Sequence, residues 1–70
     1  MAANPNKAMD RIRALEGALV DLRAQLETIT TGLAQDATNT SLVIRRVNVM
    51  KRIMVAQSEI DTLRSTLRQM

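Results

Sequence analysis

The residues of this chain with the greatest capacity for chemistry are basic, and they are concentrated in one segment. Residues 42–56, LVIRRVNVMKRIMVA, hold four of the ten basic residues and no acidic residue. We call these four the basic patch: Arg45, Arg46, Lys51 and Arg52. Guanidinium and ammonium groups bind phosphate and carboxylate oxygens. The segment is also the most apolar part of the chain, which favours contact with a partner.

Catalytic residues are scarce. The chain has no His and no Cys, so the commonest general base, the commonest metal ligand and any thiolate nucleophile are missing. Glu59 and Asp61 are two positions apart and do not share a helix face. Gly17 and Gly32 stand alone, so they form no glycine-rich phosphate loop. No carboxylate cluster resembles a calcium or magnesium loop. We therefore expect a non-enzymatic protein with no metal ion or other cofactor.

Size and composition limit the architecture. Seventy residues without an aromatic side chain build one domain with a thin core of Leu, Ile, Val, Met and Ala. Small chains without disulfides often gain stability by oligomerising. The net charge of +3 is a mild excess and does not by itself favour nucleic acid. The first residues contain no apolar run, and the longest such run is Ile53–Ala56. We expect no secretory signal and no transmembrane helix, and a location in the cytoplasm or within a macromolecular particle.

Residues 5–33 have the pattern of a long amphipathic helix. Asn4 and Pro5 read as its N-cap and first residue, after a lead-in at residues 1–4. The apolar residues then recur every three or four positions in a heptad pattern: Ala8, Ile12, Leu15, Leu19, Leu22, Leu26, Ile29 and Leu33. We expect Gly32 to end this helix in the left-handed conformation, with Leu33 folding back as the apolar contact of a Schellman cap.

Residues 34–41 are expected to form a loop. Their sequence is polar and rich in small side chains. Thr40 or Ser41 is the expected N-cap of the next helix, with Asp36 and Asn39 as the alternatives.

Residues 42–70 carry a second heptad pattern. Its seam positions are Leu42, Arg46, Val49, Ile53, Ala56, Ile60, Leu63, Leu67 and Met70. The β-branched residues at the start would suit a strand. However, the apolar alternation fails over residues 47–50, and a lone strand would have no sheet to join. The pattern favours a helix.

The two heptads match when the chain folds back at the loop. The facing pairs are then Leu33–Leu42, Ile29–Arg46, Leu26–Val49, Leu22–Ile53, Leu19–Ala56, Leu15–Ile60, Ile12–Leu63 and Ala8–Leu67. The predicted fold is therefore all-α, an antiparallel two-helix hairpin with a coiled-coil-like seam. Arg46 is the one polar seam residue. Its stem could pack on Ile29 with the guanidinium in solvent, or its charge could fix the register or meet a partner's carboxylate.

The second helix also has large apolar residues outside the seam. They are Val43, Ile44, Val47, Met50, Met54 and Val55. A helix that is apolar over so much of its circumference is normally buried on more than one side. We expect a protein partner here, most simply a second copy that completes a four-helix bundle or a ring. In the alternative, the helices kink or the loop covers these residues, and they are ordinary core.

Three functions remain. The leading hypothesis is a structural or interaction module that self-associates or docks on a multi-subunit assembly, such as a viral or phage structural or assembly component. The alternative is a helical dimer that binds nucleic acid by contacting phosphates through Arg45, Lys51 and Arg52, although no aromatic residue could stack on bases. Binding to a membrane surface by residues 42–56 is a third reading. It is less favoured because Trp and Phe are absent and the seam already uses much of the apolar face.

Overall fold

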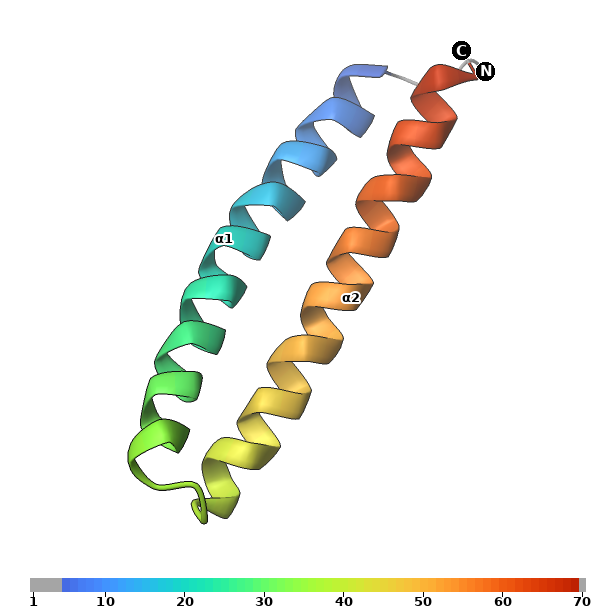
Figure 1. The fold of residues 1–70 in the computed structure, drawn as a ribbon. Coiled ribbons are helices and arrows are strands. Elements are labelled where there is room, and N and C mark those ends of the chain that lie inside the picture. Colours follow the sequence, from blue (N-terminus) through green and yellow to red (C-terminus); the bar gives the residue numbers. More distant parts are fainter. Residues whose placement is uncertain (1–4, 70) are drawn as a thin grey trace.

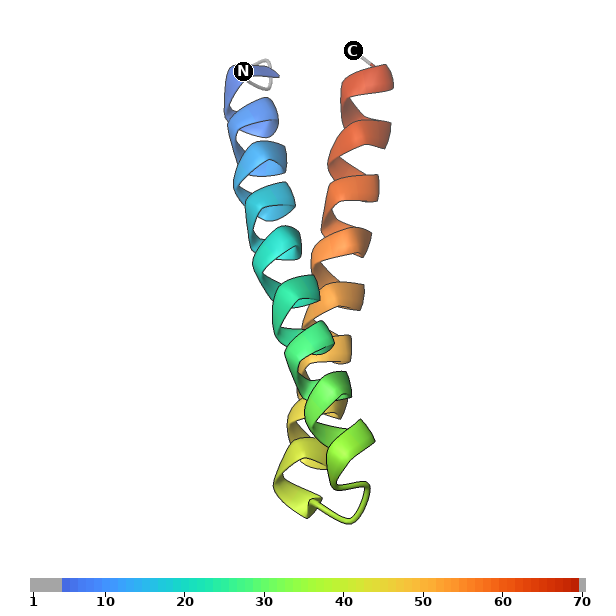
Figure 2. The ribbon, with the colours of Figure 1, turned by 60° about the vertical axis from the view of Figure 1, so that its left-hand side comes forward.

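Two long helices lie side by side and run in opposite directions (Figure 1). The computed structural model describes residues 5–69. Helix α1 spans Pro5–Gln35 and helix α2 spans Thr40–Arg68. The molecule is a rod of 53 × 15 × 14 Å. The turned view in Figure 2 shows the two helices inclined to each other, as in a coiled coil. The predicted all-α hairpin is confirmed.

The seam between the helices holds the core. One cluster, toward the chain ends, is built on Ile12, Leu15, Leu19, Ala56 and Ile60. The second, toward the loop, is built on Leu22, Ile29 and Val49. Ile60 is the most deeply buried residue, at 1% exposed. Only one face of each helix is buried in this way, because a two-helix hairpin offers each helix a single neighbour.

The clusters group the residues as the predicted register pairs them. Both members of most predicted pairs lie in the same cluster: Ile12–Leu63, Leu15–Ile60, Leu19–Ala56, Leu22–Ile53, Leu26–Val49 and Leu33–Leu42. Ile29 is buried, whereas Arg46 opposite it is exposed. Ala8 is half-buried, and Leu67 packs against the first cluster.

The end of α1 differs from the prediction. Gly32 has no positive φ, and the helix continues to Gln35. The amide of Asp36 donates to the Gly32 carbonyl at 2.9 Å, which extends the helical hydrogen bonding. The expected left-handed cap at Gly32 is therefore wrong. The reason is packing: a helical course keeps Leu33 on the seam beside Leu42, and folding back would remove it.

The start of α2 also differs. The N-cap is Asn39, whose Oδ1 accepts from the Leu42 amide at 3.2 Å. Thr40 and Ser41 lie inside the helix, so the expectation that one of them is the cap is wrong. The loop shortens to residues 36–39, where Asp36 Oδ1 accepts from the amide and hydroxyl of Thr38. These bonds satisfy loop donors within the turn itself.

Two predictions concern the chain ends. The N-cap at Asn4, with the lead-in at residues 1–4, and the seam residue Met70 lie outside the described residues.

Candidate interaction surface

The six apolar residues that the sequence singled out all lie exposed on α2. Their exposed fractions run from 43% for Met50 to 70% for Met54, with Val43, Ile44, Val47 and Val55 between these values. Neither the loop nor a kink of the helices covers them. Whether a partner does so remains a prediction.

Helical periodicity divides the six residues into two groups. Val43, Val47, Met50 and Met54 follow one another at spacings of four, three and four, so they form one row along α2. Each follows a seam position directly, which places the row beside the seam. We call this row the apolar stripe. Ile44 and Val55 are about three turns apart and lie above one another on the outward side of α2. They are separate from the stripe, and Lys51, seven positions after Ile44, shares their outward side of α2.

Two ion pairs mark the two sides of the seam. On one side Arg64 Nη2 lies 3.0 Å from Glu16 Oε1. On the other, Arg11 Nε lies 2.6 Å from Glu59 Oε2, and Arg11 Nη2 donates to Oε1 at 3.2 Å. Both pairs are solvent-exposed, with side chains 39–56% accessible, so each contributes little to stability. We name the two sides of the seam after these two pairs.

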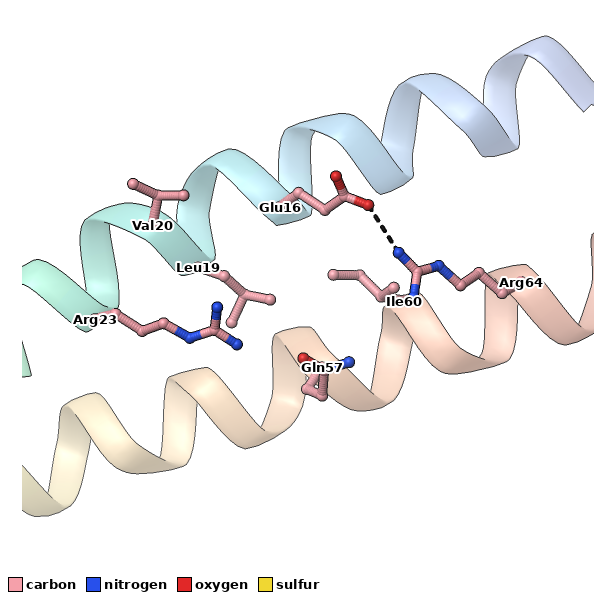
Figure 3. Close-up of a pocket in the computed structure, with 7 residues that line it drawn as sticks. All are labelled: Glu16, Leu19, Val20, Arg23, Gln57, Ile60 and Arg64. Atoms are coloured by element: carbon pink, nitrogen blue, oxygen red, sulfur yellow. Dashed lines mark hydrogen bonds and ion pairs between the residues drawn. The ribbon is translucent and has the colours of Figure 1, made fainter.

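The apolar stripe lies on the Glu16–Arg64 side. Met50, Gln57 and Arg64 are spaced by sevens, which is about two helical turns, so they share one side of α2. Figure 3 shows a groove on this side, with the Glu16–Arg64 ion pair across it and Arg23 reaching from α1 toward α2. The groove is lined by Glu16, Leu19, Val20, Arg23, Gln57, Ile60 and Arg64.

Helix α1 adds exposed apolar residues to the same side. Val20 borders the groove and is 66% exposed, and Met9 is also exposed. Met9 precedes Glu16 by seven positions and therefore shares its side of α1. Both residues lie outside the heptad pattern of the first helix. The side of the seam that carries the stripe thus has exposed apolar residues from both helices.

The four residues of the basic patch do not all lie on the same side of the seam as the stripe. Arg45, Arg52 and Glu59 are spaced by sevens, so two of the four cations lie on the Arg11–Glu59 side, across the seam from the stripe. Arg45 borders a groove with Gln25 and Ile29. Arg52 and Lys51 border another groove with Arg11 and Glu59.

The other two cations flank the stripe. Arg46 lies between the seam and the stripe, and Lys51 lies on the outward side of α2, where it adjoins the outer edge of the stripe and also borders the groove of Arg11 and Glu59. Arg46 is exposed, and no charged or polar residue is buried within residues 5–69. A buried, register-setting role for Arg46 inside the hairpin is therefore wrong, and its guanidinium reaches solvent as the simpler reading expected.

Only the spacing within α2 could have been found from the sequence. The spacing by sevens that links Arg45 to Arg52 and Met50 to Arg64 is visible in the printed chain. Assigning the two series to opposite sides needs the fold-back register. The packed helices then place Glu16 beside Arg64 and Arg11 beside Glu59, which identifies the two sides.

The Arg11–Glu59 pair shifts the pKa of both of its partners. The hydrogen bond from Arg11 holds the pKa of Glu59 below its usual value; desolvation opposes this shift and the positive charge adds to it. The same hydrogen bond, with the carboxylate charge, raises the pKa of Arg11. The two shifts agree in direction, as they should for a favourable pair.

The structure of residues 5–69 also bears on metal binding and on membrane spanning. Among residues 5–69 no three acidic side chains gather closely enough to hold a metal ion. Neither α1 nor α2 combines the length and the apolar character that a membrane-spanning helix requires.

The chain matches no protein-family model, and neither the curated proteins nor the solved structures include a significant match to it.

Proposed function

We propose that this protein is a non-enzymatic interaction module that completes a helical bundle by packing the apolar stripe of α2 against a helix of another chain. The observation that carries the proposal is the exposure of Val43, Val47, Met50 and Met54 in one continuous row. Exposed apolar rows of this kind mark contact surfaces in soluble proteins. The stripe borders the seam, so a third helix seated there would extend the existing core.

The hairpin has a physical need for such a contact. Its core comprises eight buried apolar residues among residues 5–69, and α2 contributes three of them, Val49, Ala56 and Ile60. A small chain of this kind gains stability when a partner covers more apolar surface. A subunit or assembly component of a multi-copy particle, viral or phage, would use a hairpin in this way. The protein would then reside in the cytoplasm or within the particle.

Self-association at high salt, where charge repulsion is screened, tests whether the stripe forms a contact between chains. The mass of the chain is measured by light scattering over a wide concentration range at low and at high salt. We expect association in high salt, where repulsion between the basic patches is screened. Met50→Asp should abolish it and leave the helical circular dichroism unchanged. Asn48→Asp adds the same charge two positions away, about half a helical turn from Met50 and off the stripe, and should associate normally.

Two results would overturn the proposal. One is a wild-type chain that stays monomeric at every concentration and salt level and also binds no amphipathic helical peptide through the stripe. The other is association that survives Met50→Asp, because the contact would then lie elsewhere on the molecule.

Binding to phosphates is a second candidate, supported by the placement of Arg11, Lys51 and Arg52 around one groove. Glu59 in the same groove is engaged by Arg11 and offsets part of that charge. Contacts of this kind weaken steeply with salt. Since the chain has no Trp or Tyr, ultraviolet absorbance of a purified sample would come chiefly from bound nucleic acid. Absorbance that disappears after a high-salt wash would favour this candidate, and its absence at low salt would exclude it.

A further inference from the structure

The charges beside the apolar stripe indicate what kind of helix covers it. Arg46 lies along one edge of the stripe and Lys51 along the other. Helix α2 has no acidic residue before Glu59, and Glu59 is engaged by Arg11, so no acidic residue of this helix pairs with Arg46 or Lys51. On α1, Arg23 and Glu27 are one turn apart on the same side and offset each other. The stripe therefore lies between two uncompensated positive edges.

A second copy seated on the stripe meets an electrostatic obstacle. The spacings of the stripe read the same in both directions, so two antiparallel stripes would match their apolar residues across a two-fold axis. The same symmetry brings each Arg46 near its symmetry mate and each Lys51 near its own. Like charges at such positions are destabilising. The apolar rows of two copies would therefore match, but the positive charges beside them would repel.

We infer that the occupant of the stripe is an amphipathic helix of a different protein, with a narrow apolar row flanked on both sides by Asp or Glu. Its apolar row covers Val43, Val47, Met50 and Met54, and its carboxylates face Arg46 and Lys51. Charges at the rim of an interface act mainly on partner choice and association rate, and the apolar row supplies most of the affinity. This inference rests on the proposed function and adds the chemistry of the partner.

The test uses two synthetic helical peptides that differ only in their flanking charges. Both carry the same Leu row at spacings of three and four; one has Glu along both edges and the other has Lys. Binding to the full-length chain is followed by fluorescence anisotropy of a labelled peptide at low salt. We expect the Glu-flanked peptide to bind at least roughly tenfold more tightly, as two exposed ion pairs with matching repulsion in the other peptide would produce. Its affinity should fall as salt is added, opposite to the self-association described above.

Charge reversal identifies the residues responsible. The double variant Arg46→Glu with Lys51→Glu should invert the preference and bind the Lys-flanked peptide more tightly. Arg52→Glu makes the same kind of change across the seam and should leave the preference intact. Lys51→Glu alone, on the outer edge, should reduce the preference without touching the seam, which guards against a fold defect from the change at Arg46.

The outcomes separate this inference from the proposed function. If both peptides bind equally and Met50→Asp blocks both, the stripe is a docking surface and the inference about charge is wrong. If neither peptide binds, or binding survives Met50→Asp, the inference fails. The proposed function itself fails only if the self-association experiment also shows no contact through the stripe.

Discussion

Arg11 and Glu59, 48 residues apart in sequence, form a two-pronged hydrogen bond from α1 to α2, at 2.6 and 3.2 Å. Glu16 and Arg64 have the same separation and pair on the other side of the seam. The two pairs reverse the order of acid and base along the chain. Together they bracket the seam near the chain ends and oppose a shift of one helix along the other.

The Arg11–Glu59 pair predicts a loss of stability in acid. The pKa of Glu59 is lower in the folded chain than its ordinary value, because Arg11 stabilises the carboxylate. The stabilising contribution is therefore fully present above the unfolded pKa and is lost as the pH falls through the folded pKa. Thermal unfolding followed by circular dichroism at a series of pH values should show a decline on this acidic side that is smaller in Glu59→Gln. Identical pH profiles for the two proteins would contradict the prediction.

Truncation of a seam residue should destabilise the hairpin strongly. Leu22 is buried in the cluster nearer the loop. Leu22→Ala should lower the free energy of unfolding by about 2–5 kcal/mol, because it leaves a cavity in a thin core. Val20→Ala is the matched control two positions away, at a side chain that is mostly exposed. It should change stability by less than about 0.5 kcal/mol in urea unfolding. Similar effects at the two sites would contradict the packing of the seam.

The two glycines should respond differently to replacement by alanine. Gly17 is helical and has open space where a Cβ would lie. Gly17→Ala should therefore stabilise the protein by up to about 1 kcal/mol through helix propensity. At Gly32 an added Cβ would lie 2.8 Å from Leu42 Cδ1, so that side chain must move. Gly32→Ala should gain clearly less in thermal unfolding, and an equal gain would show that the helices do not approach closely there.

The N-cap of α2 is testable by single substitutions. Asn39 Oδ1 accepts from the Leu42 amide, so Asn39→Ala should cost about 0.5–2 kcal/mol of unfolding free energy. Thr40→Ala lies one position further, inside the helix, and should be close to neutral. Chemical denaturation of the two variants compares them directly. A larger loss at Thr40 than at Asn39 would place the cap at Thr40.

Local signals near the loop were poor guides to the helix ends. Gly32 has a strong statistical preference for the left-handed position after a helix, and Thr40 and Ser41 are good caps. The structure overrides both preferences, because keeping residues 33–35 helical holds Leu33 in the seam. Asn39 can then cap α2 from a shorter loop. Packing between helices, which no local pattern contains, selected among several acceptable turns.

The sequence by itself determined the hairpin and its register, because heptad spacing fixes which face of each helix is apolar and the loop fixes which residues meet. It also determined which apolar residues on α2 would be left outside the seam. Only the tertiary structure showed on which side of the seam the apolar stripe and the basic residues of α2 lie. Once the helices pack, Met50 falls on the Glu16–Arg64 side and Arg52 on the Arg11–Glu59 side. The physical reason is that the seam, and therefore its two sides, exists only when two helices pack together. Residues of a single helix cannot be assigned to one side or the other before that.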